Sequence, residues 1–152
     1  MKITLNQDPV FSETEVIINC PQADEDILHL VAMLRVHQRK LVGTWEGESY
    51  LLDVKDILYI DTADKRTFLY TLGRVYESAL RLYELEEALA GLEFLRASRS
   101  AIVSFRHVQS IRPELGGRLL VTMEGGERLY VSRQCAAAWR EKLRELERSF
   151  VK

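Results

Sequence analysis

Phe94-Leu-Arg-Ala-Ser-Arg-Ser-Ala-Ile-Val103 places a short basic and hydroxyl-rich segment between two apolar runs. The apolar runs are typical of a core, whereas Arg96 and Arg99 carry guanidinium donors and Ser98 and Ser100 carry hydroxyl groups. Because such groups bind phosphates and base edges, the segment predicts a turn that contacts an anion. The alternative is an exposed turn whose arginines are solvated or pair with a neighbouring glutamate.

The length and composition indicate a soluble globular protein. The 152 residues fit one domain of ordinary size with a small appendage. A composition that is 47% hydrophobic and 29% charged excludes a chain that is disordered throughout. The N-terminus lacks the apolar region of a signal peptide, and no apolar run is long enough to span a membrane. We therefore expect a cytoplasmic protein.

Charge is distributed unevenly along the sequence. Residues 1–60 hold five Lys or Arg against ten Asp or Glu, and residues 61–95 hold four against seven. Residues 96–133 hold seven arginines against three glutamates, and residues 134–152 hold five basic against three acidic residues. The net charge of −2 therefore conceals a basic second half that suits an anionic partner. Arginine in place of lysine favours forked hydrogen bonds to phosphate or guanine.

Residue types that carry enzyme or metal chemistry are scattered. Cys20 and Cys135 have no metal-binding spacing and are predicted to be buried thiols rather than a disulfide. His29 and His37 are too far apart to share a metal, and His107 is interpreted as a surface or hydrogen-bonding residue. No nucleophile-base pair or glycine-rich phosphate loop is present. We expect no enzyme, no cofactor, no metal site and no small-molecule substrate.

The first 44 residues predict two strands and a helix. Lys2–Leu5 and Glu15–Asn19 have the apolar or alternating pattern of strands. Residues 24–42 carry apolar side chains at helical spacing as far as Leu41, and Gly43 ends the pattern. The apolar stripe predicts packing against the rest of the domain or, alternatively, a dimer seam.

Beyond Thr44 the sequence predicts short strands joined by glycine-rich turns, with two more helices. A hairpin is expected around Gly47, and further strands are expected over 57–60, 67–72, 75–77, 101–105, 108–111, 118–123 and 128–131. Leucines at helical spacing predict a helix over 79–91. Ser132 is placed to cap a last helix with Trp139 on its apolar side. The predicted class is mainly β with a few helices, α+β overall.

Five segments occur in a fixed order along this part of the chain. They are Asp56-Ile-Leu-Tyr-Ile-Asp61, Thr67-Phe-Leu-Tyr-Thr71, Leu82-Tyr-Glu-Leu-Glu-Glu-Ala-Leu89, Phe94-Leu-Arg-Ala-Ser-Arg-Ser-Ala-Ile-Val-Ser104 and Gly125-Gly-Glu-Arg-Leu-Tyr-Val-Ser-Arg133. Together they resemble the LytTR DNA-binding domain of bacterial transcription regulators. The resemblance places a LytTR-like domain over residues 45–152 and leaves residues 1–44 as an appendage for dimerisation or regulation.

The resemblance implies small packed β-sheets whose loops enter successive major grooves of bent DNA, in place of a recognition helix. By position, the loop that begins at Asp64 matches the family's first DNA-contacting loop, Arg99 matches a base-reading position, and Arg133 matches the arginine of a Val-Ser-Arg element. The residues predicted to bind DNA are Lys65, Arg66, Thr67, Arg96, Ser98, Arg99, Ser100 and Arg133.

Two residues depart from the family pattern. Ser98 stands where the family frequently has His, and Ser104 stands where an Asn often follows the Val. The base preference of this chain is therefore left open. Ser100 and Ser132 also have structural alternatives, as a turn-stabilising hydroxyl and as a helix cap.

The expected partner is double-stranded DNA, bound by a homodimer, because one small basic face gives too little affinity against a genome of competing sites. The residues before Trp45 are too few for a receiver domain, so the chain resembles a short stand-alone regulator, for which a small membrane protein stays open as a partner. A protein-interaction module whose basic face binds an acidic partner remains an alternative. A small enzyme remains another, with Asp61, Asp64 and His107 as its only candidate residues.

Overall fold

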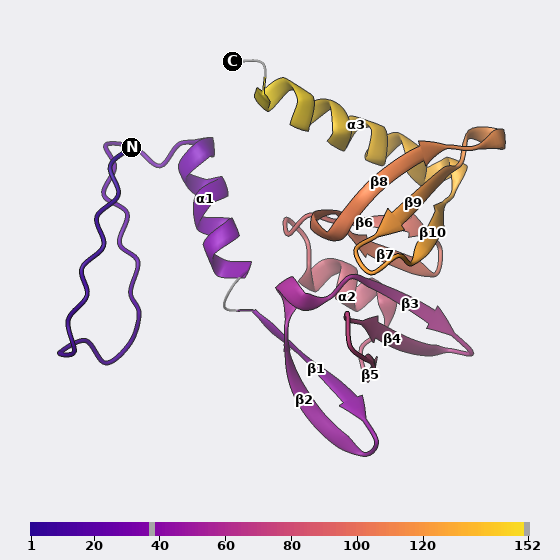
Figure 1. The fold of residues 1–152 in the computed structure, drawn as a ribbon, viewed down its shortest axis with the longest axis horizontal. Helices are drawn as coiled ribbons and strands as arrows, with labels where there is room; N and C mark the ends of the chain where they lie inside the picture. Colours follow the sequence, from indigo (N-terminus) through magenta and orange to yellow (C-terminus); the bar gives the residue numbers. More distant parts are fainter. Residues whose placement is uncertain (37–38, 151–152) are drawn as a thin grey trace.

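The structure, a computed structural model, describes residues 1–36 and 39–150 (Figure 1). In the described part, ten strands form two antiparallel sheets with the orders β2-β1-β5-β4-β3-β7-β6 and β10-β9-β8. The strands are β1 (Lys40–Trp45), β2 (Glu48–Asp53), β3 (Tyr59–Ala63), β4 (Arg66–Tyr70), β5 (Val75–Ser78), β6 (Phe94–Ser98), β7 (Ala101–Ser104), β8 (Val108–Pro113), β9 (Leu119–Met123) and β10 (Arg128–Val131). The helices are α1 (Glu25–Val36), α2 (Leu82–Ala88) and α3 (Arg133–Phe150). The predicted α+β class, mainly β, is confirmed.

Alternating side chains on the central strands give the seven-stranded sheet two buried faces. On β3, Tyr59 joins a core shared with the three-stranded sheet and α3, whereas Ile60 joins a core covered by α2. On β7, Val103 and Ile102 divide in the same way. Because successive side chains in a strand point to opposite faces, a strand buried on both sides is apolar throughout. The apolar runs around the basic turn are therefore strands anchored in two cores.

Helix α3 closes the first core through Trp139, whose side chain is fully buried. The indole ring packs against Phe105 with the ring centroids 5.6 Å apart, and its Nε1 donates to the Arg96 carbonyl at 2.9 Å. At the start of the helix, the Ser132 hydroxyl accepts a hydrogen bond from the Cys135 N–H at 3.3 Å. The structural interpretation of Ser132 as a helix cap is thereby confirmed.

The N-terminal part differs from its prediction. Lys2–Leu5 and Glu15–Asn19 form no strand, because neither pairs with another strand in the described part of the chain. The described helix α1 spans Glu25–Val36, and Leu41, which was predicted to be helical, lies in β1. Pairing of β1 with both β2 and β5 explains this difference, since ladder hydrogen bonds and cross-strand contacts outweigh a helical pattern. The large sheet consequently begins before the predicted domain boundary.

Three smaller expectations can also be compared with the structure. Cys20 is exposed and Cys135 is partly exposed, so the prediction of buried thiols is wrong, although both are free. Cys20 is uncovered because the strand predicted over Glu15–Asn19 does not form, and Cys135 is partly exposed at the first turn of α3. His37 lies outside the described residues. Within residues 1–36 and 39–150, no helix is both long and apolar enough to cross a membrane.

Candidate nucleic-acid interface

Main-chain hydrogen bonds join three segments of the predicted site: the β3–β4 hairpin, the β6–β7 turn and the start of α3. The Thr62 N–H donates to the Ser100 carbonyl at 2.9 Å, which ties the hairpin to the turn. The Ser132 N–H donates to the Ala97 carbonyl at 2.7 Å, which ties the residue before α3 to β6. These bonds place segments that are distant in sequence along one edge of the molecule, called the loop edge below.

The β3–β4 hairpin turns through Asp64 and Lys65, which have positive φ angles of 53° and 64°. Two successive positive φ angles are typical of a type I′ turn, which matches the twist of the strands that it joins. Both side chains are exposed, and the described residues provide no ion-pair partner for Lys65. The hairpin therefore carries an ammonium group at the tip of the loop edge.

The other two residues predicted for this loop are engaged within the protein. Arg66 forms an ion pair with Glu77 of β5, including a contact of 3.2 Å between Arg66 Nη2 and Glu77 Oε2. The hydrogen bond holds the pKa of Glu77 below its ordinary value and raises that of Arg66. Thr67 is only 5% exposed within β4, which leaves its side chain no surface for a duplex. Of the three, Lys65 is the residue that is free to contact a ligand.

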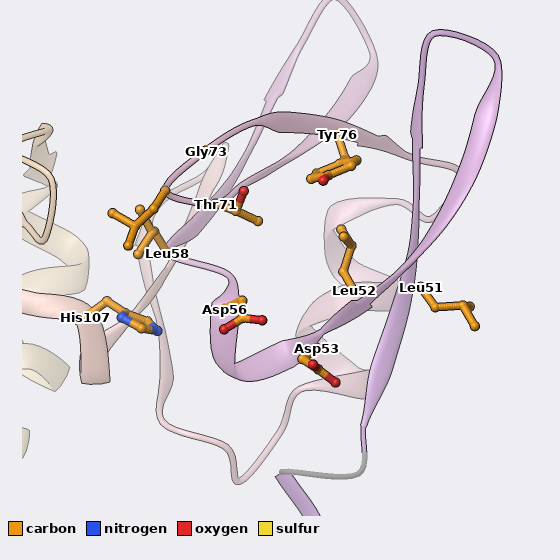
Figure 2. Close-up of a pocket in the computed structure, with 10 residues that line it drawn as sticks. Leu51, Leu52, Asp53, Asp56, Leu58, Thr71, Gly73, Tyr76 and His107 are labelled. Atoms are coloured by element: carbon orange, nitrogen blue, oxygen red, sulfur yellow. The ribbon is translucent and has the colours of Figure 1, made fainter.

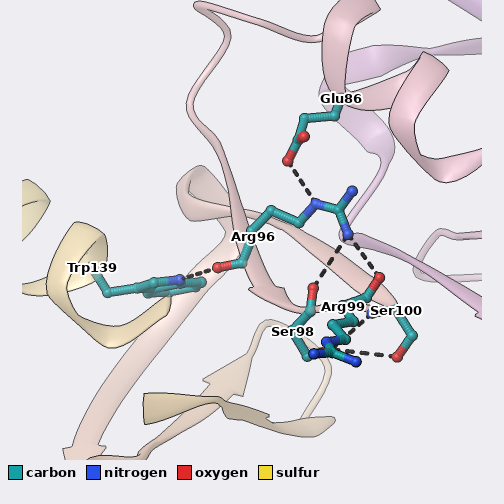
Figure 3. A network of polar contacts seen from close by, with 6 residues as sticks. All are labelled: Glu86, Arg96, Ser98, Arg99, Ser100 and Trp139. Atoms are coloured by element: carbon teal, nitrogen blue, oxygen red, sulfur yellow. Dashed lines mark hydrogen bonds and ion pairs between the residues drawn. The ribbon is translucent and has the colours of Figure 1, made fainter. Parts of the chain in front are cut away.

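At the tip of the β6–β7 turn, the Arg99 side chain is exposed (Figure 3). The Ser98 and Ser100 hydroxyls lie 3.3 Å apart, and the Ser100 N–H donates to the Ser98 hydroxyl at 3.2 Å. This local hydrogen bond stabilises the turn. It leaves Arg99, which has no ion pair among the described residues, as the group that projects from the turn.

Arg96 lies differently, although it is only three positions away (Figure 3). Its Nε donates to Glu86 of α2 at 2.6 Å, and its Nη1 donates to the Arg99 carbonyl at 2.8 Å and the Ser98 carbonyl at 3.3 Å. The side chain is 28% exposed. The guanidinium group is therefore occupied by protein acceptors.

A depression of about 480 Å³ separates the β6–β7 turn from the start of α3. Its lining combines three serine hydroxyls with two arginines and the first turn of the helix, namely Arg96, Ser98, Arg99, Ser100, Ser132, Gln134 and Cys135. Hydroxyl donors, an exposed guanidinium group and the positive end of a helix dipole all favour an anion. The lining suits a phosphate group.

Arg133, the first residue of α3, extends the loop edge toward the β8–β9 connection. Its exposed side chain lies along Gly117, with Cγ 3.1 Å from the position that a Cβ on that glycine would occupy. Arg140 donates to the Gly117 carbonyl at 3.4 Å. Arg118, which follows Gly117 in sequence, stacks over the Tyr130 ring, with its Cζ 4.6 Å from the ring centroid. Basic side chains thus continue from the turn past the start of α3.

The arginines further along α3 are paired within the helix. Arg144 and Arg148 both contact Glu141, at 3.6 Å and 2.9 Å. Such exposed ion pairs contribute little to stability, and these arginines remain solvated. The charges of these two arginines are therefore offset by Glu141, unlike those of Arg99 and Arg133 on the loop edge.

The candidate enzyme residues do not form one site. Both ring nitrogens of His107 are engaged, Nδ1 with Glu124 at 2.9 Å and Nε2 with the Lys55 carbonyl at 2.5 Å, so its hydrogen-bonding role is confirmed. Asp61 contacts Tyr70, and Asp64 lies at the hairpin tip. The described residues contain no group of three potential metal ligands.

A second pocket, of about 350 Å³, lies on another part of the molecule (Figure 2). It lies between the β1–β2 hairpin and the β4–β5 turn, with His107 at one side, and its walls include Leu51, Leu52, Leu58 and Tyr76. Asp53 and Asp56 also line it, but the nitrogens of His107 already have other partners. Neither ring nitrogen of His107 is therefore free to act as a base in this pocket.

A partly buried carboxylate lies beneath the hairpin. Burial raises the pKa of Asp61, and a hydrogen bond with Tyr70 opposes the shift. Asp61 Oδ1 is buried without a hydrogen-bond partner in the described structure. Tyr70 stacks on Tyr59 with the centroids 4.1 Å apart, and burial raises the pKa of Tyr70 to about 12.

Sequence reasoning missed Glu86 and Gly117 as neighbours of the site. Glu86 belongs to the exposed side of a predicted amphipathic helix, where a glutamate is ordinarily solvated. Gly117 falls in one of the predicted glycine-rich turns, a position that by itself indicates no contact with the site. No local pattern reveals either contact, because each partner comes from a distant element of the fold.

Comparison with known proteins identifies a family for the larger part of the chain. The sequence profile of the LytTr DNA-binding domain matches residues 47–144. Over 145 residues the chain is 24% identical to an HTH-type transcriptional regulator of Staphylococcus aureus (strain NCTC 8325), covering 94% of this chain and 98% of that protein. The sensory transduction protein LytT of Bacillus cereus is 28% identical over 109 residues, covering 72% of this chain and 44% of LytT.

A solved structure is also similar. The LytTr DNA-binding domain of a methyl-accepting/DNA response regulator from Bacillus cereus aligns with a TM-score of 0.65 at 26% identity, over 68% of this chain and 95% of that one. That domain is therefore matched almost completely by part of the present chain. The Staphylococcus aureus relative, in contrast, is matched along almost its whole length, so the similarity extends into the N-terminal part.

Proposed function

The chain belongs to the LytTr DNA-binding domain family, and from this premise we propose that it is a transcriptional regulator that binds specific duplex DNA through its loop edge. The observation that carries the proposal is the gathering of Lys65, Arg99 and Arg133 on three segments joined by main-chain hydrogen bonds. Each side chain is exposed, and none has an ion-pair partner among the described residues.

The proposed contacts divide into two kinds. Arg99 and Arg133 read base edges in the major groove, where one arginine fork on guanine provides about 1–3 kcal/mol of discrimination. Lys65, the serine hydroxyls and the start of α3 bind phosphates and set the register. The described helices are separated from one another by strands, so no helix pair is available as a helix-turn-helix. Loops are therefore the reading elements in this proposal.

We infer that the protein acts as a homodimer in the cytoplasm and that its N-terminal part provides the contact between copies. The support is a set of exposed apolar side chains in residues 1–36: Ile3, Leu5, Val10, Phe11, Val16, Ile17 and Leu28. Apolar side chains in such number are ordinarily buried against a partner. This acidic part faces away from the duplex, and a small membrane protein is the other partner that could cover it.

The decisive experiment selects duplexes from a random-sequence library with the full-length protein and measures binding by fluorescence anisotropy. The selected duplex should bind more tightly than a scrambled one, and the logarithm of the binding constant should fall with that of the salt concentration by about 0.9 per phosphate contacted. Arg99→Ala and Arg133→Ala should each weaken binding by about tenfold or more without changing the thermal midpoint.

Arg144→Ala is the matched control, because this arginine is exposed but paired with Glu141 on the outer part of α3. Its affinity should stay close to that of the wild type. Equal binding of selected and scrambled duplexes by the wild type and both loop variants would contradict the proposal. That result would favour a module that binds acidic partners without reading sequence.

A further inference from the structure

We propose that Arg96 positions the β6–β7 turn instead of contacting DNA, and that Glu86 of α2 acts through Arg96 to present Arg99 to the duplex. The inference rests on the function proposed above and adds to it a residue outside the loop edge. It gives two neighbouring arginines in one segment different roles: Arg99 touches the ligand, and Arg96 holds the frame that carries Arg99.

The geometry of the guanidinium group supports this division. Arg96 Nε donates to Glu86 at 2.6 Å, which fixes the plane of the group. With the plane fixed, Nη1 reaches the Arg99 carbonyl at 2.8 Å and the Ser98 carbonyl at 3.3 Å (Figure 3). An arginine has five donors in a rigid fork, so one planar group can hold a carboxylate and two carbonyls together.

The turn needs this support because β6 is irregular just before it. Arg96 pairs with Ile102, but Ser98 pairs with Ala101, so the register shifts across Ala97. A bulge of this kind disrupts the local ladder and redirects the strand. Contacts from outside the ladder must therefore set the direction of the turn.

Besides the main-chain bonds from Thr62 and Ser132, two helices supply such contacts. The Arg96 carbonyl accepts the Trp139 indole N–H from α3 at 2.9 Å, while the Arg96 side chain reaches α2 through Glu86. Trp139 is fully buried in the core, so it fixes the main chain at this point. Arg96 thus connects the turn to α3 through its main chain and to α2 through its side chain.

The same contacts argue against Arg96 as a DNA contact. Its charge is offset by Glu86, and a neutralised pair adds little to the positive field that a phosphate would feel. Its side chain is 28% exposed, whereas that of Arg99 projects from the turn. A turn held in the bound geometry before DNA arrives loses less conformational freedom on binding.

The first test is Glu86→Gln against Glu87→Gln, with the duplex that the wild type selects and its scrambled counterpart as probes. Both substitutions remove one negative charge from neighbouring positions of α2, but only Glu86 contacts Arg96. Removal of a carboxylate near DNA should strengthen binding slightly if charge alone mattered. We expect Glu87→Gln to bind like the wild type or slightly more tightly, and Glu86→Gln to bind the selected duplex about tenfold more weakly.

The second test separates positioning from contact in Arg96 itself. Arg96→Lys keeps the charge but loses the fork, so it should weaken specific binding as Glu86→Gln does. Arg96→Gln should leave the salt slope unchanged, whereas Lys65→Gln, which removes a proposed phosphate contact, should lower it by about one. Glu86→Gln combined with Arg96→Gln should be no weaker than Arg96→Gln alone, because both act through one contact.

Circular dichroism and the thermal midpoint establish that each variant is folded. Misfolding is least expected for Glu86→Gln, because the Glu86 side chain is half-exposed. The inference is overturned if Glu86→Gln and Glu87→Gln bind equally well, or if Arg96→Gln lowers the salt slope by about one. Failure of the wild type to distinguish the selected duplex from the scrambled one would instead contradict the proposed function. The variants therefore test the positioning role, whereas the wild type alone tests the proposed function.

Discussion

The N-terminal part, residues 1–36, and the two-sheet body, residues 40–150, use apolar side chains in opposite ways. In the body, residues such as Ile60 and Val121 are fully buried in one of two cores. In the N-terminal part, Ile3 is 86% exposed and Ile17 is 69% exposed. Since burial of apolar surface is the main stabilising contribution to a fold, the body contains its own cores, whereas the N-terminal part leaves these apolar side chains uncovered in the described structure.

The largest difference between the two regions should appear in stability. Trp139→Ala empties a fully buried site and removes the hydrogen bond to the Arg96 carbonyl, so it should lower the free energy of unfolding by about 3–5 kcal/mol. Ile17→Ala should change it by less than about 0.5 kcal/mol, because no core loses a contact. Urea denaturation followed by circular dichroism measures both. A comparable loss in Ile17→Ala would show that the N-terminal part packs on the body.

Deletion of residues 1–36 tests the comparison directly. The body should keep its thermal midpoint, because both cores and all ten described strands remain. The proposed dimer should dissociate, which light scattering measures, and affinity for a duplex with two half-sites should fall about a hundredfold as avidity is lost. An unfolded body, or a dimer that survives the deletion, would contradict this assignment of roles. A duplex with one half-site serves as the control and should be bound equally well.

The smallest expected effect lies within the body, at the one described buried side-chain atom without a hydrogen-bond partner, Asp61 Oδ1. Burial raises the pKa of Asp61, so the folded state holds its proton more tightly than the unfolded chain does. Its contribution to stability is present below the unfolded pKa of about 4 and is lost as the pH rises through the raised value.

Asp61→Asn should therefore stabilise the protein at neutral pH by less than about 1 kcal/mol, since the carboxylate is partly solvated. The difference from the wild type should vanish at acidic pH. Thermal midpoints measured across this range check the sign. A variant that is less stable at neutral pH would show that the ionised carboxylate has a favourable partner.

The contrast between the regions also explains what the sequence could predict. Trp139 and the Ser132 cap followed from helical spacing and capping chemistry, which are local signals. Leu41 was placed in a helix because its spacing suited one, but its pairing with Leu52 of β2, within a strand that also pairs with β5 through Thr44, decided its state. The segments around Ile3 and Ile17 have the pattern of strands, yet a strand also needs a partner, which a single-chain pattern does not contain.

For the candidate site too, local signals predicted the segments but not the contacts that their residues make with distant elements. The segments that carry Lys65, Arg99 and Arg133 were identified from the sequence, and their assignment to DNA stays a prediction. The burial of Thr67 and the engagement of Arg66 with Glu77 depend on the neighbours of β4, which local spacing does not specify. Glu86 was invisible because its partner belongs to another element.

The β6–β7 turn is held mainly by hydrogen bonds to its main-chain atoms. Thr62, Ser132 and the Arg96 guanidinium all bind its carbonyls or those of the adjoining strand. Among the described residues, none of the contacts that hold the turn involves the Arg99 side chain, so that position can change its chemistry without loosening the scaffold. Under the proposed function, one substitution at the tip would let a lineage of such proteins acquire a new operator, and the same position is where an engineer would randomise the chain to redirect it.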